Sequence, residues 1–412
     1  MSRLPALVLT AILVCSLPAL GVPGAIGQSP APAIGSPAGA QPAIEGGSID
    51  WLALSEGPAA SGEGYVAIDF GATLADDSSR LEARYDEHRV DARIENADSD
   101  AQRRAIIREE SDQLEESVAQ LRERERAAYA AYYESQRTER DLLAELAVIH
   151  TNAVALEAAV ASIEDHDATT PGVSLDGELE EMEVATRTMQ GPVRERVAAM
   201  IHGEAEPTRV HVESDGDGVV LALIEGEQFH REAHRLGNRD TDAEAQYTSL
   251  GESEERIAEL YPSVFSEARW SYSEVGHGTH RGTANHPQGS LTVFLDTATG
   301  DVYREFQTLR LDRLDTETAV VETGDGVTVT VGLTAPGGPA KVMVTATGSG
   351  AALSGEVTLN DRVVGETDDG TVWFVAPRDS VTGAVNAGGE EIEFTVPGDS
   401  ADQESARATE GS

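Results

Sequence analysis

The chain has 412 residues, and its 73 acidic against 30 basic residues give it a formal net charge of −43. No basic stripe remains that could neutralise phosphates, so nucleic acid is excluded as a partner. The single cysteine, Cys15, lies in an apolar run near the N-terminus. Without that run the mature chain has no disulfide, no thiolate zinc site and no cysteine nucleophile.

The charge balance predicts a protein adapted to high salt. Carboxylates that repel one another in dilute buffer barely interact in molar salt, where the Debye length is about 3 Å. Lys341 is the only lysine, and 40% of the residues are hydrophobic, which argues against an acidic disordered chain. In these respects the sequence resembles multi-domain exported proteins of halophilic archaea, which as a family lack an assigned activity.

Residues 1–27 have the layout of a signal peptide. A short apolar run is followed by small residues, with Ala25 and Gly27 at the two positions that a signal peptidase reads. We expect cleavage before Gln28 and export to the cell surface or the medium, whereas an uncleaved segment would anchor the chain in a membrane. Residues 28–48, rich in Pro, Ala, Gly and Ser, are expected to form a flexible tether.

A short β/loop segment, residues 49–75, is followed by a helical region, residues 76–168. The first contains one predicted strand, residues 65–70. The second has neither proline nor glycine as far as His166. From Ile107 to Ile163, alternating steps of three and four residues give seventeen positions, of which thirteen are apolar. This 3.5-residue spacing is typical of a coiled coil.

Two arrangements of the helical region stay open. A break at residues 95–102 would let residues 79–94 fold back on one continuous helix over residues 100–164, giving a helical hairpin within the chain. Alternatively, the apolar spacing joins two chains, so that self-association occurs through the helical region. We favour the hairpin, because the shorter segment is also apolar at spaced positions: Leu81, Tyr85, Val90 and Ile94.

Residues 169–315 are predicted to form an α+β domain. Helices are expected at 177–202, with a stop and restart at Gly191-Pro192, and at 252–262. Strands are expected at 208–214, 219–236, 267–275, 289–296 and 301–311. The hairpin "LDTATGDV" resembles that of propeptide-type (PepSY-like) modules, which implies a binding or inhibitory module.

Residues 316–398 are predicted to form an all-β, immunoglobulin-like sandwich. Their apolar residues alternate, and turn signals recur every 8 to 12 residues. The run from Gly355 to Pro377, with its "TDDG" turn before an apolar strand, resembles carboxypeptidase-regulatory-like β-sandwich modules, which are accessory domains of surface proteins. The polar residues 399–412 are expected to form a disordered tail.

The stretch "GHGTH" from Gly276 to His280 looks like the segment around the catalytic histidine of subtilisin-type proteases. A triad also needs an orienting aspartate and a nucleophilic serine. The sequence has no "DTG" or "DSG" strand end upstream and no "GTS" before a proline downstream. It also has no phosphate loop, dinucleotide fingerprint or nucleophile elbow, so we expect no catalytic residue and no cofactor.

Histidines suggest a metal site as the alternative. His277, His280 and His286 lie in an expected loop between strands and could bind a metal ion there. His230 and His234 in "HREAH" lack the glutamate that directly follows the first histidine of a zincin helix. Their segment also reads as a strand, on which residues four apart are about 13 Å apart.

The sequence therefore favours an exported, salt-adapted binding or structural protein that is not an enzyme. Its protein or cell-surface partner is not identified by any motif. Two alternatives stay open: a metal-dependent hydrolase that uses the histidine-rich segment 277–286, and a regulator of a secreted protease suggested by the propeptide-like hairpin.

Overall fold

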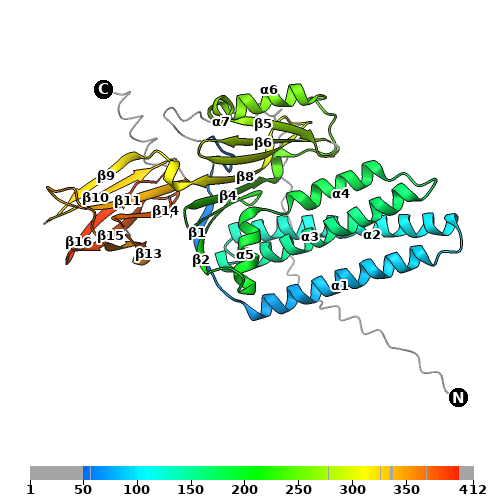
Figure 1. The fold of residues 1–412 in the computed structure, drawn as a ribbon, viewed down its shortest axis with the longest axis horizontal. Coiled ribbons are helices and arrows are strands. Elements are labelled where there is room, and N and C mark those ends of the chain that lie inside the picture. Colours follow the sequence, from blue (N-terminus) through cyan, green and yellow to red (C-terminus); the bar gives the residue numbers. More distant parts are fainter. Residues whose placement is uncertain are drawn as a thin grey trace, which may run out of the picture. The chain divides into compact units, whose positions relative to one another are not determined.

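The computed structural model describes residues 50–55, 57–276, 278–324, 326–334, 337–367 and 369–398. The predicted signal peptide, tether and tail lie outside these residues, as does His277. Within them the chain is multi-domain. A helical N-terminal region is followed by an eight-stranded sheet and then by a C-terminal β-sandwich (Figure 1).

Five helices make up the described N-terminal region: α1 (Phe70–Glu95), α2 (Asp100–Tyr133), α3 (Glu139–Thr169), α4 (Asp176–Thr188) and α5 (Pro192–His202). The predicted breaks at 95–102 and at Gly191-Pro192 are confirmed. The continuous helix predicted over residues 100–164 is wrong, because the chain turns back after Tyr133. Since α2 and α3 pack against each other, the long coiled coil is replaced by a bundle within one chain.

The turn between α2 and α3 falls at polar positions of the apolar spacing. Ser135 has a φ of 60°, in the left-handed region that ends helices. Thr138 then caps α3: its hydroxyl accepts from the Asp141 amide at 3.3 Å, and the Asp141 carboxylate accepts from the Thr138 amide at 3.2 Å. This capping box satisfies two amides at the helix start. The polar residues Ser135 and Glu139, which interrupt the apolar spacing of the predicted coiled coil, therefore mark a turn.

α3 is the central helix of the bundle. By length and composition it is apolar enough to cross a membrane, with a mean hydropathy of 1.6 over its most apolar part. It packs against α1, α2, α4, α5 and β1, so its apolar faces are used within the protein. Its composition is that of a core helix that is covered on several sides.

Eight strands form one antiparallel sheet in the order β1-β2-β3-β4-β8-β7-β6-β5. Their bounds are β1 (Ala60–Val66), β2 (Thr208–Ser214), β3 (Gly218–Glu225), β4 (Gln228–Arg235), β5 (Arg269–Glu274), β6 (Thr279–His286), β7 (Gly289–Asp296) and β8 (Val302–Arg310). The strand predicted at 65–70 is wrong for most of its length: β1 ends at Val66, so only Tyr65 and Val66 are shared, and Phe70 already begins α1. β4 pairs with β8, with Glu232 opposite Phe306, and so joins two meanders into one sheet.

Helices cover both faces of the sheet. Successive side chains of a strand point to opposite faces, so one strand contributes residues to both cores. Val219 and Leu221 of β3 belong to a core shared with α2, α3 and α5. Val220 and Ala222 belong to a second core, shared with α6 (Leu250–Leu260) and α7 (Pro262–Glu267). Figure 1 shows α1 to α5 on one face and α6 and α7 on the other.

The predicted C-terminal sandwich is confirmed. One four-stranded sheet has the order β14-β11-β10-β9 and the other the order β13-β12-β15-β16. Their bounds are β9 (Glu317–Thr323), β10 (Val327–Leu333), β11 (Pro339–Ala346), β12 (Gly355–Leu359), β13 (Arg362–Glu366), β14 (Thr371–Val375), β15 (Val381–Ala387) and β16 (Glu390–Val396). Alternate residues such as Val329, Val342, Val357 and Phe394 form its core, as a period of two requires.

Candidate functional site

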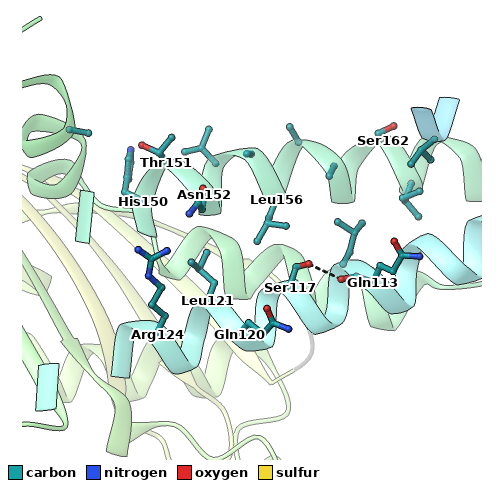
Figure 2. A pocket seen from close by; sticks show the side chains of 18 of the residues that line it. Gln113, Ser117, Gln120, Leu121, Arg124, His150, Thr151, Asn152, Leu156 and Ser162 are labelled. Atoms are coloured by element: carbon teal, nitrogen blue, oxygen red, sulfur yellow. Dashed lines mark hydrogen bonds between the residues drawn. The ribbon is translucent and has the colours of Figure 1, made fainter. Parts of the chain in front are cut away.

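A groove of about 1000 Å³ lies between the helices of the N-terminal region. α2 and α3 form its length, and α1 and α5 contribute Val90 and Ala198. Figure 2 shows Leu121 directed from α2 toward α3 and Leu156 directed from α3 toward α2. Each long helix contributes two large apolar residues about two turns apart to the lining: Leu114 and Leu121 on α2, and Leu156 and Ile163 on α3.

Uncharged polar side chains edge this apolar surface. Gln113, Ser117 and Gln120 come from successive turns of α2, and Asn152 comes from α3 (Figure 2). The Ser117 hydroxyl donates to the backbone carbonyl of Gln113 at 2.8 Å. Amides and hydroxyls of this kind donate and accept hydrogen bonds without carrying charge. This part of the edge therefore suits a ligand that is polar at places but not ionic.

Two of the charged side chains that line the groove, Glu110 and Arg124, are paired with neighbouring helices; Glu195 and Glu204 line it as well. Arg124 of α2 binds Glu145 of α3. Glu110, farther along α2, binds Arg93 of α1. Each pair cancels one charge beside the groove, and both are partly exposed to solvent, which screens them further.

His150 lies near the end of the groove that faces the sheet. Its Nδ1 is buried and has no hydrogen-bond partner among the described residues. Burial lowers the pKa of the His150 imidazole, so the ring is neutral at pH 7. Buried polar atoms in proteins nearly always have a partner. Because Nδ1 is closed to a molecule the size of water, a ligand hydroxyl in the groove could reach only the other ring nitrogen, Nε2.

Next to the groove, a buried ionic network ties the helices to the sheet. Arg194 of α5 is fully buried. Its Nε donates to Glu232 of β4 at 2.8 Å, and its Nη2 donates to the Tyr129 hydroxyl of α2 at 2.6 Å. Its Nη1 donates to Glu125 of α2 and to the Met189 carbonyl. One guanidinium therefore joins α2, α5 and β4.

A second buried arginine balances the charges of this network. Arg304 of β8 donates through Nη2 to the Gln190 carbonyl at 2.8 Å, and the same nitrogen is 3.5 Å from Glu232. Arg194 and Arg304 thus face two carboxylates, those of Glu125 and Glu232. With two charges of each sign, the cluster is neutral overall, which is the condition for burying it.

Glu125 stays ionised although it is buried. Burial by itself would raise the pKa of Glu125, but the positive charges of Arg194 and Arg304 outweigh it and hold this pKa well below its usual value. Burial lowers the pKa of His234, whose Nδ1 lies 3.2 Å from the Tyr129 hydroxyl. At neutral pH the histidine is therefore uncharged while Glu125 carries its full charge.

The opposite face of β4 and β8 carries a second buried pair. Arg231 donates to Glu305 at 2.8 Å, and the Tyr261 hydroxyl of the loop between α6 and α7 donates to Glu305 at 2.6 Å. Burial raises the pKa of Glu305. Arg231 and Glu232 are adjacent in sequence but point to opposite faces. Neighbouring charges on one strand thus belong to separate clusters.

The structure does not bring the described histidines of the predicted metal segment together. The loop expected at 277–286 is wrong from Thr279 onward, because these residues form β6 between β5 and β7. His280 is buried, shares a 2.6 Å hydrogen bond with Ser253, and has its pKa lowered by burial. His286 is six residues away on the same strand, which corresponds to about 20 Å.

The strand predicted for "HREAH" is confirmed as β4, and its histidines point to different partners. His230 lies 3.2 Å from the Thr308 hydroxyl, whereas His234 joins the Arg194 network. In the part of the chain that the structure describes, no group of three His, Asp or Glu residues has the arrangement of a metal site.

Sequence reasoning missed Arg194 and its partners. The available signals were charged residues at positions that the pattern reserves for apolar ones. Glu125 occupies such a position in the coiled-coil spacing, and Glu232 and Arg304 stand in the middle of strands. A charge placed there is either exposed or paired.

Three family models match successive parts of the chain. Residues 1–206 match a domain of unknown function (DUF7096), and residues 210–315 match a family of unknown function (DUF7094). Residues 318–394 match an archaeal fibronectin-III type-like domain, so the sandwich is of this kind. The resemblances to carboxypeptidase-regulatory-like and PepSY-like modules are not confirmed. No curated protein and no solved structure matches.

Proposed function

The chain belongs to the family described as domain of unknown function DUF7096, whose model covers half of it, and we propose that it is an exported, salt-adapted binding protein rather than an enzyme. We infer that its ligand is an extended apolar molecule with one uncharged hydrogen-bonding head group. The groove between α2 and α3 holds this ligand.

The groove is the observation that carries the proposal. Its lining on α3 runs from His150 to Ile163, about 20 Å at 1.5 Å per residue. Its volume lies at the upper end of the range for ligand pockets, and its surface combines apolar residues with a few polar ones, as ligand pockets do. A compact ligand would leave much of this length unfilled, whereas an extended chain contacts both Leu114 and Leu121.

The chemistry of the head group follows from His150. The neutral ring lines the groove, and Nε2 is the ring nitrogen open to a ligand there, because Nδ1 is fully buried. A carboxylate or phosphate there would be a buried charge beside a neutral imidazole, which is costly. A hydroxyl gives the ring a hydrogen bond without that cost, so an alcohol is the expected class.

Export and salt adaptation rest on the sequence. The signal-peptide layout of residues 1–27 and the tether 28–48 are those of a chain held outside the cell, and the charge of −43 is tolerable in molar salt. An archaeal fibronectin-III type-like domain beside the binding region fits a surface protein that presents its groove to the surroundings.

Fluorescence titration of the purified protein in molar salt with a pyrene-labelled long-chain alcohol tests the proposal. Ala159 lines the groove, and Ala159→Trp would fill it and weaken binding by roughly tenfold or more. Ala161 is exposed on the same helix and does not line the groove, so Ala161→Trp is the matched control and should leave affinity unchanged.

The head group has its own variant, His150→Phe, which keeps the ring and removes both nitrogens. It should weaken the alcohol more than the corresponding hydrocarbon, because only the alcohol loses a hydrogen bond. Equal affinity of the wild type and Ala159→Trp for the labelled alcohol would refute the proposed site. Turnover of peptides, esters or glycans by the purified chain would contradict a non-enzymatic role.

A further inference from the structure

α1 carries an apolar stripe that points to solvent. Phe70 is 84% exposed, Leu74 70%, Leu81 71% and Tyr85 69%. Monomeric proteins scatter exposed apolar residues singly, whereas several on one helix face mark a candidate interaction surface. The exposed Asp77 and Ser78 lie between Leu74 and Leu81 and divide this face into two apolar halves. We refer to Phe70, Leu74, Leu81 and Tyr85 as the α1 stripe.

The four residues lie on one side of the helix. Phe70 and Leu81 are eleven residues apart, as are Leu74 and Tyr85, and eleven residues make about three turns. At 100° per residue the four positions fall within an arc of about 60°. Along the axis they extend over about 23 Å.

The orientation of α1 is fixed by contacts at its start and end. Asp69 caps it by accepting from the Gly71 and Ala72 amides at 3.0 and 3.1 Å. The Asp69 amide donates to the carbonyl of Ile201 in α5 at 3.2 Å. Toward the other end, Val90 is buried in the core shared with α2 and α3. The stripe therefore points away from the chain's own core.

We propose that the α1 stripe is an interface with a second copy of this chain, packed antiparallel about a twofold axis. The stripe reads aromatic, leucine, leucine, aromatic, and it is symmetric about the midpoint between residues 77 and 78. An antiparallel pair therefore places Phe70 against Tyr85 of the partner subunit and Leu74 against Leu81 of the partner subunit. A surface that complements itself in this way is what an isologous dimer requires.

The exposed area is sufficient for a specific contact. An aromatic side chain buries about 150–250 Å² and a leucine somewhat less, so the stripe offers roughly 500–600 Å² at its observed exposures. Two copies would bury roughly 1,000–1,200 Å², the lower limit for a specific interface. Since two chains of charge −43 repel each other, the dimer needs molar salt to form.

Sedimentation equilibrium of the full chain in molar salt measures the association. Wild type should sediment with twice the mass of one chain at high concentration, and Leu74→Glu should weaken dimerisation at least tenfold. Val321→Glu is the matched control, because Val321 is also exposed, at 57%, but lies on β9. A wild type that stays monomeric, or a control that weakens dimerisation equally, overturns the proposal.

Cysteine cross-linking tests the antiparallel register. In a Cys15→Ser background the chain has no other thiol, so introduced cysteines report only on each other. Leu74→Cys with Leu81→Cys should give a covalent dimer on mild oxidation, whereas Leu74→Cys alone should not. Cross-linking by Leu74→Cys alone would mean a parallel pair and would refute the proposed arrangement. Circular dichroism confirms that each variant is folded.

Discussion

Replacing Arg194 by methionine should destabilise the protein far more than the same change at an exposed arginine. Arg194 is fully buried and bonded to Glu125, Glu232 and Tyr129. Arg194→Met leaves Arg304 alone against two buried carboxylates. Removing one partner of a buried ion pair costs about 3–5 kcal/mol, and most domains are stable by only about 5–15 kcal/mol.

The control lies two residues along the same helix. Arg196 is 40% exposed at its side chain and donates to Glu225 at 2.7 Å. Arg196→Met removes an exposed pair, which is worth about 0–1 kcal/mol and less in molar salt. Urea unfolding of both variants in molar salt, followed by circular dichroism, compares the two costs directly.

A second substitution tests whether charge imbalance is the cause. In Arg194→Met with Glu125→Gln, the remaining charges are those of Arg304 and Glu232, which balance. The double variant should therefore regain about 1–3 kcal/mol over Arg194→Met alone. If Arg194→Met and Arg196→Met cost the same, or if the second substitution destabilises further, the reasoning is refuted.

Three further outcomes are expected. Dialysis from molar to millimolar salt should remove most of the circular-dichroism signal of the folded chain, because the charge of −43 is then unscreened; full retention contradicts salt adaptation. The pKa of His234 is lowered on folding, so as pH falls below about 6.5 the unfolded chain binds a proton that the folded chain does not. The free energy of unfolding should therefore decrease as the pH is lowered below about 6.5. In His234→Gln, the dependence of this free energy on pH should be shallower by up to about 1.4 kcal/mol per pH unit. Thr138→Ala removes the cap of α3 and should cost about 1 kcal/mol in urea unfolding, whereas Ser117→Ala, exposed within α2, should cost less than about 0.5 kcal/mol.

Elements could be predicted from the sequence where the apolar periodicity and the residues that end helices or form turns indicate the same structure. Gly191-Pro192 separates two helices as expected, and the alternating residues of the C-terminal part form a sandwich. The turn at Ser135 was missed because alanine-rich helices continue smoothly on both sides of it. Its signal was local: a polar run that ends in the capping pair Thr138 and Asp141.

β6 shows why a polar strand is hard to predict. "THRGTANH" has no aromatic and no β-branched apolar residue, the types that usually mark a strand. One of its small residues is explained by the neighbouring strand: a Cβ at Gly282 would lie 3.1 Å from the ring of Trp270 in β5. That constraint comes from a partner strand, so it is invisible in the segment itself.

The Arg194 network lies beyond sequence reasoning for a related reason. Its charges come from α2, α5, β4 and β8, and their neutrality appears only when these elements meet. In an acidic chain each glutamate taken alone is most simply a solvated residue. The groove could not be predicted from the sequence either, because its lining comes from four helices. In the sequence, its apolar residues look like those that pack two helices against each other.

α1 carries two different surfaces that the sequence presents as one. Leu81, Tyr85, Val90 and Ile94 read as a single apolar spacing, but the step from Tyr85 to Val90 is five residues, which turns the helix by about 140°. Val90 and Ile94 are accordingly buried, whereas Leu81 and Tyr85 face solvent. Since Val90 lines the groove and the stripe lies on the other side of the helix, a substitution such as Leu74→Glu leaves the groove lining intact. Loss of dimerisation in Leu74→Glu should therefore leave ligand binding in the groove unchanged, so the titration and the sedimentation experiment test the two proposals independently.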